Sequence, residues 1–121
     1  MRNRIKSFGY AIRGIKAVFG REPNMNIHLI AAFLVLCFGV FLQISAIEWM
    51  ACLLCFGLVI GMEMMNSAIE TVVDLVSPET HPLAGKAKDV AAGAVLVCAV
   101  ITAIVGTMIF GPKLWTLFLK I

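Results

Sequence analysis

The segment from Val90 to Phe110 contains no charged residue and is long enough to cross a membrane, since a spanning helix needs about 20 apolar residues. Two further stretches, 25–43 and 47–76, are also predominantly apolar. The chain is 61% hydrophobic, with a mean hydropathy of +0.99, and 121 residues cannot enclose that much apolar surface. We therefore expect an all-α membrane protein with three transmembrane helices.

An amphipathic helix is expected before these spans, because apolar residues recur there at helical spacing and basic residues occupy the opposite side. Such a helix is typical of the membrane interface, where its cations serve either as an anchor alone or also bind an anionic ligand. The single domain 1–121 then divides as follows: amphipathic helix 4–19, span one 25–43, span two 47–76 with a cytoplasmic extension, cytoplasmic loop 77–89, span three 90–110 and tail 111–121. We expect Gly111 and Pro112 to end the third span and no secretory signal peptide.

Charge distribution predicts the orientation. Eight of the ten Lys and Arg residues precede the first span or lie between spans two and three, and only Lys113 and Lys120 follow the third. By the positive-inside rule the N-terminus and the 77–89 loop are expected in the cytoplasm. Nucleic-acid binding is not expected, because no basic groove with interleaved aromatic residues is present.

The four cysteines all fall in apolar segments. Cys52 and Cys55 form a C-x-x-C pair, but a zinc site needs a second ligand pair and a redox motif needs a polar, accessible setting. We interpret the cysteines as buried or lipid-facing hydrophobic residues, with no disulfide framework.

Three acidic residues form a line on the second apolar helix. At about 100° per residue, Glu70 lies within about 20° of Glu63 around the helix axis, and Asp74 lies within about 20° of Glu63 on the other side. Asn66 and Ser67 flank this line. A carboxylate at membrane depth costs roughly 2.5–3.5 kcal/mol, which makes it a functional candidate. Glu63 and Glu70 are about 10 Å apart along the axis, so we expect them to have different tasks.

Further polar residues collect at the cytoplasmic end on this topology, which favours an interfacial site over a pore: Tyr10, Glu22, His28, Glu79, His81, Lys88 and Asp89. Glu22 and Glu70 are a plausible pair for Mg²⁺, which usually takes one or two protein carboxylates together with phosphate oxygens and water. Lys88 offers a cation for phosphate, and Asp89 either orients it or binds nucleotide hydroxyls or solvent. No P-loop or protein-kinase motif occurs.

Several of these residues also have structural interpretations. His28 is either a ligand contact or a hydrogen-bonded structural histidine. Asp74 is a candidate for capping or pairing near the helix end, and Asn66 for bridging helices.

Two motifs resemble the bacterial integral-membrane diacylglycerol kinase and undecaprenol kinase family. They are Glu63-x-x-Asn66-Ser67-Ala68-Ile69-Glu70-x-Val72-Val73-Asp74 and Ala87-Lys88-Asp89-x-Ala91-Ala92-Gly93-Ala94-Val95. Three segments look more like the undecaprenol kinases: Asn24-x-x-Ile27-His28, His81-Pro82-Leu83-Ala84 and Phe110-Gly111-Pro112-Lys113-Leu114.

The resemblance implies ATP-dependent phosphorylation of a membrane lipid alcohol, with undecaprenol as the expected acceptor and undecaprenyl phosphate as the product. It also implies a homotrimer with shared sites in the bacterial cytoplasmic membrane. It implies Glu63 as general base supported by Asn66, and Mg²⁺ held by Glu22 and Glu70. The implied nucleotide contacts are Tyr10, Glu22, Glu70, Glu79, His81, Lys88 and Asp89. The implied lipid contacts are Glu63, Ala92 and His28. The alternatives are a diacylglycerol kinase and, more distantly, a small multidrug-type transporter.

Overall fold

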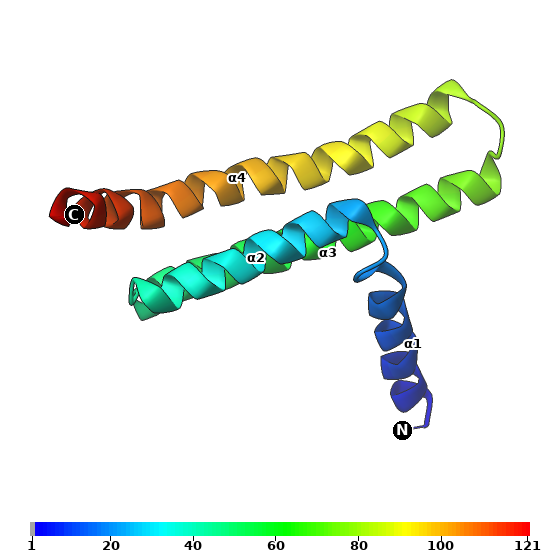
Figure 1. Cartoon of the computed structure of the whole chain (residues 1–121). Coiled ribbons are helices and arrows are strands. Elements are labelled where there is room, and N and C mark those ends of the chain that lie inside the picture. The colour runs from blue at the N-terminus through cyan, green and yellow to red at the C-terminus, as the bar shows by residue number, and fades with distance from the viewer. Residues whose placement is uncertain (1) are drawn as a thin grey trace.

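The computed structural model describes residues 2–121, which form four helices joined by short connections. The helices are α1 (Arg2–Val18), α2 (Pro23–Phe41), α3 (Ala46–Val76) and α4 (Pro82–Lys120). Helix α3 packs against both α2 and α4, whereas α1 leaves the bundle at a steep angle (Figure 1). Each of α2, α3 and α4 is long and apolar enough to cross a membrane. The expected all-α architecture with three candidate spans is confirmed.

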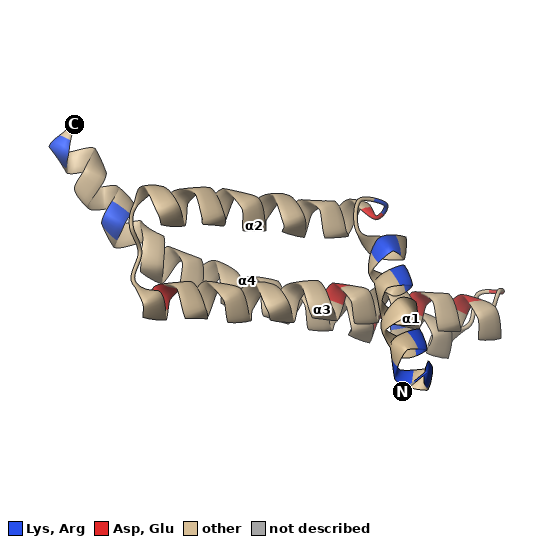
Figure 2. Cartoon of the chain, turned by 90° about the horizontal axis from the view of Figure 1, so that it is seen from below, with Lys and Arg blue, Asp and Glu red and all other residues tan. Residues whose placement is uncertain are grey.

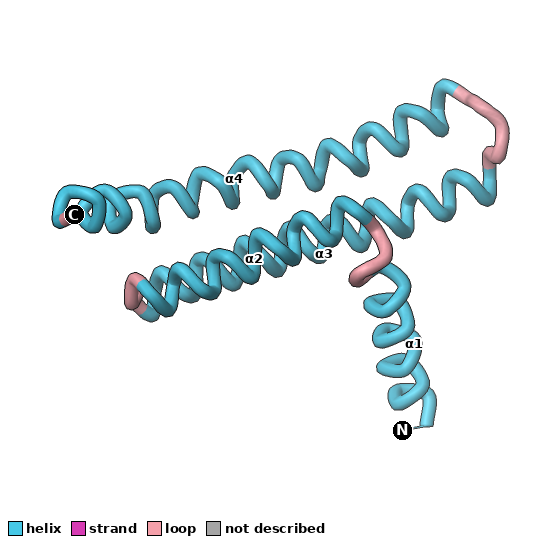
Figure 3. The backbone as a smooth tube through the Cα atoms, in the orientation of Figure 1, coloured by secondary structure: helices cyan, strands magenta, loops and turns pink. Residues whose placement is uncertain are grey.

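Local sequence signals set the connections between α1, α2 and α3 (Figure 3). Gly20 adopts a φ of 75° between α1 and α2, a conformation that glycine accepts without steric cost, and Pro23 occupies the first position of α2. Between α2 and α3, Ser45 and Glu48 form a capping box: the Glu48 N–H donates to Ser45 Oγ at 3.2 Å, and the Ser45 N–H donates to Glu48 Oε1 at 2.9 Å. This arrangement satisfies two otherwise unpaired donors at the start of α3.

The loop between α3 and α4 is shorter than expected. We predicted a loop over 77–89, but α4 begins at Pro82. The His81 side chain accepts a hydrogen bond from the Leu83 N–H at 3.1 Å through Nδ1 and so caps the helix, while Pro82 is favoured in its first turn. The small and charged residues of 83–89 therefore form the first turns of α4, and the predicted boundary was wrong.

The expected stop at Gly111 and Pro112 was also wrong, because α4 continues through Pro112 to Lys120. Proline removes one backbone donor and bends a helix, and the last turns of α4 diverge from its main axis (Figure 2). The Thr116 hydroxyl donates to the Pro112 carbonyl at 2.9 Å. In apolar surroundings a bent helix leaves fewer backbone groups unpaired than a loop would, so the segment 111–121 is not an irregular tail.

A small core closes the end of the bundle remote from α1. Ile44, Cys52, Ile109 and Phe110 form its buried cluster, and Trp49 packs against them. Beyond this core, large apolar side chains are exposed along α2, α3 and α4, as expected for helices that face lipid or other apolar surfaces. The cysteines are free thiols.

The three long helices differ in length. At 1.5 Å per residue, α2 spans about 28 Å, whereas α3 and α4 span about 46 and 58 Å, more than the hydrocarbon core of about 30 Å. Helices α3 and α4 extend together past the end of α2 on the side where α1 lies (Figure 1). The predicted acidic line of α3 begins at Glu63, beside His28 of α2, and runs toward this extension.

Candidate active site

Two polar side chains are buried within residues 2–121, and both lie on α3. Glu63 is 2% exposed and Asn66 is 5% exposed, whereas Glu70 and Asp74 are exposed. Burial therefore decreases along the acidic line toward the end of α3 that carries the loop. Burying a carboxylate is costly unless it has partners or a function.

Glu63 faces α2. Its Oε2 lies 3.7 Å from Nε2 of His28, and both side chains line a cavity of about 210 Å³ together with Asn24, Asn66 and Ala92. The polar groups of this cavity come from α2 and α3, while α4 contributes an apolar wall. The cavity thus offers a carboxylate for a hydroxyl group and an apolar surface for an attached hydrocarbon. Three residues expected to contact lipid, Glu63, Ala92 and His28, are brought together here.

Asn66 connects this cavity to the next turn of α3. Its Nδ2 donates to Glu70 Oε1 at 3.4 Å. Its Oδ1 is buried without a hydrogen-bond partner, and an unpaired buried acceptor costs about 1–3 kcal/mol. The Asn66 amide nitrogen therefore holds the exposed Glu70 carboxylate, and the Asn66 amide oxygen can accept a hydrogen bond from a further donor.

Glu22 reaches the same part of α3 from the connection between α1 and α2. Ser67 Oγ donates to Glu22 Oε1 at 2.5 Å. Ser67 precedes Glu70 by three residues, so the two share one side of the helix. Sequence reasoning identified Ser67 only as a flanking residue and assigned it no role; its position between Asn66 and Glu70 was the available signal.

The Glu22 and Glu70 carboxylates indicate which kind of cation could bind here. Among residues 2–121, no group of three His, Cys, Asp or Glu side chains is arranged to hold a metal ion. Mg²⁺ usually needs only one or two protein carboxylates, because phosphate oxygens and water complete its coordination. Glu22 and Glu70, held by Ser67 and Asn66, fit that pattern.

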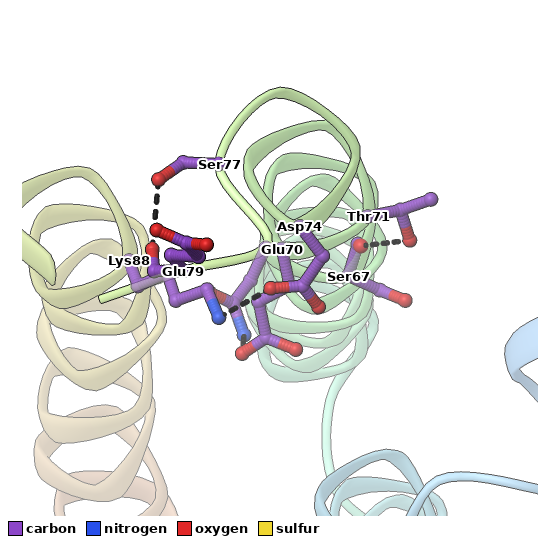
Figure 4. A network of polar contacts seen from close by, with 8 residues as sticks. Ser67, Glu70, Thr71, Asp74, Ser77, Glu79 and Lys88 are labelled. Atoms are coloured by element: carbon purple, nitrogen blue, oxygen red, sulfur yellow. Dashed lines mark hydrogen bonds and ion pairs between the residues drawn. The ribbon is translucent and has the colours of Figure 1, made fainter. Parts of the chain in front are cut away.

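A cation from α4 lies beyond Glu70. Lys88 Nζ is 2.6 Å from Asp74 Oδ1, and Lys88, Asp74 and Glu70 gather between the two helices (Figure 4). Asp74 thus pairs near the end of its helix, one of the interpretations expected for it. Both partners are substantially exposed, so Lys88 also remains accessible to other anions.

Four residues expected to contact nucleotide form no hydrogen bond or ion pair with Glu22 or Glu70 in the described part of the chain: Tyr10, Glu79, His81 and Asp89. The Tyr10 ring is exposed and lies 5.5 Å from the guanidinium carbon of Arg13 on its own helix. The His81 side chain caps α4. A single chain therefore gathers Glu22, Glu63, Asn66 and Glu70 but not the full predicted set.

The sequence matches a known family. A profile described as prokaryotic diacylglycerol kinase matches residues 9–110, which include α2, α3, the α3–α4 loop and most of α4. The chain belongs to the prokaryotic diacylglycerol kinase family. The predicted resemblance is confirmed, and the chain is a multi-pass membrane lipid kinase for which the family implies ATP as phosphoryl donor.

Individual members of the prokaryotic diacylglycerol kinase family show the degree of similarity. The chain is 49% identical over 109 residues to the undecaprenol kinase of Bacillus subtilis, covering 90% of this chain and 89% of that protein. It is 39% identical over 116 residues to a diacylglycerol kinase of Synechocystis sp., covering 95% of this chain and 66% of that protein. It is 35% identical over 100 residues to the diacylglycerol kinase of Escherichia coli K12, covering 83% and 82%.

Proposed function

We propose that the protein transfers the γ-phosphoryl group of ATP to undecaprenol, forming undecaprenyl phosphate and ADP. The observation that carries this proposal is the buried carboxylate of Glu63 in a cavity with an apolar wall. The choice of acceptor is supported by the 49% identity to an undecaprenol kinase.

Glu63 is proposed as the general base. Its carboxylate accepts the proton of the lipid hydroxyl while the hydroxyl oxygen forms a bond to the γ-phosphorus and the bond between that phosphorus and the ADP oxygen breaks. Its position in a cavity with an apolar wall suits this task, because a general base must lie within hydrogen-bond reach of the hydroxyl group that it deprotonates. Asn66, which lines the same cavity and contacts Glu70, is proposed to hold the two halves of the site in register.

Glu22 and Glu70 are proposed to hold Mg²⁺ on the phosphates. When bound, the ion would neutralise phosphate charge, and phosphoryl transfer depends mainly on such positioning and charge stabilisation. Lys88 is proposed to contact phosphate oxygens. Tyr10, Glu79, His81 and Asp89 are proposed as further nucleotide contacts.

We propose a homotrimer with shared sites, because a single chain leaves these nucleotide contacts apart. Two glycines also favour association: Gly57 and Gly61 lie one turn apart on α3, and an added Cβ at either would meet no atom within 4 Å. Their open face would let another helix approach closely.

The proposed location is the bacterial cytoplasmic membrane with the N-terminus inside. Basic residues are spaced along α1 (Figure 2), and α1 leaves the bundle on the side toward which α3 and α4 extend past α2 (Figure 1). In that orientation α1 would lie in the interface with its cations against anionic headgroups, and Glu22, Glu70 and Lys88 would face cytosolic ATP.

Diacylglycerol is the alternative acceptor, since relatives at 39% and 35% identity are diacylglycerol kinases. A small multidrug-type transporter is a weaker alternative. A transporter would place polar groups along a path through the membrane, whereas the buried polar residues within 2–121 both lie on α3, next to its exposed acidic end.

The test measures phosphate transfer from labelled ATP to undecaprenol and to diacylglycerol in mixed micelles of the full-length protein. We expect undecaprenol to be the better substrate. Glu63→Gln should lower kcat by roughly 10²–10⁴-fold, the usual contribution of a general base, while nucleotide binding stays near the wild-type level. Glu48→Gln is the control, because Glu48 lies at the opposite end of α3. Preference for diacylglycerol would overturn the acceptor, and full turnover by Glu63→Gln would overturn the role of that residue.

A further inference from the structure

The Glu22 side chain is not used to cap its own helix. Glu22 occupies the N-cap position of α2 with extended backbone angles, yet its side chain accepts no hydrogen bond from the first turn. An N-cap side chain commonly accepts from the backbone N–H groups that begin a helix. Here the carboxylate is directed instead toward α3, where Ser67 donates to it.

The bond between Ser67 and Glu22 joins residues 45 positions apart in a partly buried setting. At 2.5 Å it is as short as hydroxyl–carboxylate bonds become, and such charge-assisted bonds are roughly twice as strong as neutral ones. Among residues 2–121, it is the one side-chain hydrogen bond between α3 and the connection that precedes α2. It therefore links the Glu22 carboxylate directly to α3.

Two adjacent residues of α3 each hold one of the two carboxylates. Ser67 donates to Glu22, and Asn66 donates to Glu70. Since Ser67 and Glu70 are one turn apart on the same side of α3, the hydroxyl places Glu22 next to that turn.

We propose that Ser67 is a positioning residue that holds the Glu22 carboxylate at the divalent-cation site. This inference rests on the proposed function of Glu22 and Glu70. Ser67 does not face the cavity of Glu63, His28 and Ala92, so its loss should weaken cation and nucleotide binding and leave lipid binding unchanged.

The test compares Ser67→Ala and Ser67→Thr with the wild-type protein in micelles, with Mn²⁺ as the spectroscopic probe. Bound Mn²⁺ is measured by electron paramagnetic resonance in the presence of a non-hydrolysable ATP analogue, and apparent KM values are measured for MgATP and for the lipid. Losing a hydrogen bond to a charged group should weaken Mn²⁺ binding roughly 10-fold and raise the KM for MgATP, with an unchanged lipid KM. Ser67→Thr, which keeps the hydroxyl, should restore both values.

Two further variants separate positioning from a general effect on α3. Thr71→Val removes a hydroxyl one turn away that bonds only to the Ser67 carbonyl of its own helix, and it should bind Mn²⁺ like the wild type. Because Ser67 acts through Glu22, the double variant of Glu22→Gln and Ser67→Ala should bind no more weakly than Glu22→Gln alone.

Wild-type Mn²⁺ affinity in Ser67→Ala, equal losses in Ser67→Ala and Thr71→Val, or additive losses in the double variant would each overturn the role of Ser67. These outcomes leave the proposed function standing as long as the wild-type protein phosphorylates lipid. A wild-type protein that neither binds Mn²⁺ with nucleotide nor phosphorylates either lipid would refute the proposed function itself.

Discussion

Replacing Gly39 by alanine is expected to destabilise the folded chain without lowering the turnover of the molecules that remain folded. A Cβ on Gly39 would lie 2.6 Å from Cη2 and 2.8 Å from Cζ2 of Trp49, and 3.2 Å from Cδ1 of Ile44. The indole ring packs against the buried cluster that includes Ile44, so it has little room to retreat. Overpacking of this kind costs about 1–3 kcal/mol, and the better helix propensity of alanine offsets at most about 1 kcal/mol.

Gly106→Ala on α4 is the matched control, because a Cβ there meets no atom within 4 Å. Thermal unfolding in detergent should give a lower Tm for Gly39→Ala than for Gly106→Ala. The kcat per folded molecule should be unchanged, since Gly39 packs against the core at the end of the bundle remote from α1. Combining Gly39→Ala with Trp49→Leu should recover most of the stability. Equal Tm values for the two alanine variants would refute the steric argument.

Two other changes probe local contacts. Ser45→Ala removes the capping box with Glu48 and should lower the free energy of unfolding by about 1 kcal/mol. Ser7→Ala is the control and should have little effect, because the Ser7 hydroxyl bonds only to a carbonyl of its own helix. Equal losses of stability in thermal unfolding would contradict the capping role of Ser45. In a double-mutant cycle, Asp74→Asn and Lys88→Met should give a coupling energy close to zero, because water and salt screen an exposed ion pair. A strongly favourable coupling energy in thermal unfolding would contradict this expectation.

Hydropathy was sufficient to predict the helical architecture and the three candidate spans, because long uncharged stretches have few alternatives to a membrane helix. The start and end of α4 were harder to predict from the sequence. Capping by His81 and the bend at Pro112 depend on which backbone groups would otherwise be left unpaired, and residue composition indicates a loop in both places.

Helical spacing predicted that Glu63, Asn66 and Glu70 lie on or beside one line of α3. It did not predict which of them are buried, because burial depends on where neighbouring helices cover that line. The partner of Glu22 was not predicted either. The contact with Ser67 joins distant segments, and its existence depends on how the start of α2 docks against α3. Lys88 and Asp74 were both identified as polar groups of one end, but their pairing also required the docking of α3 against α4.

Within residues 2–121, nine apolar side chains are buried, and Glu63 and Asn66 share that scarce interior. In this fold, the interior available for apolar packing is also the interior that holds Glu63 and Asn66, so stability and the proposed site compete for the same space. Filling the space around Glu63 with apolar groups would raise thermostability, but it would remove the groups proposed for catalysis. Adaptation to heat is instead expected at lipid-exposed positions and in the core around Ile44, where changes leave the acidic line intact.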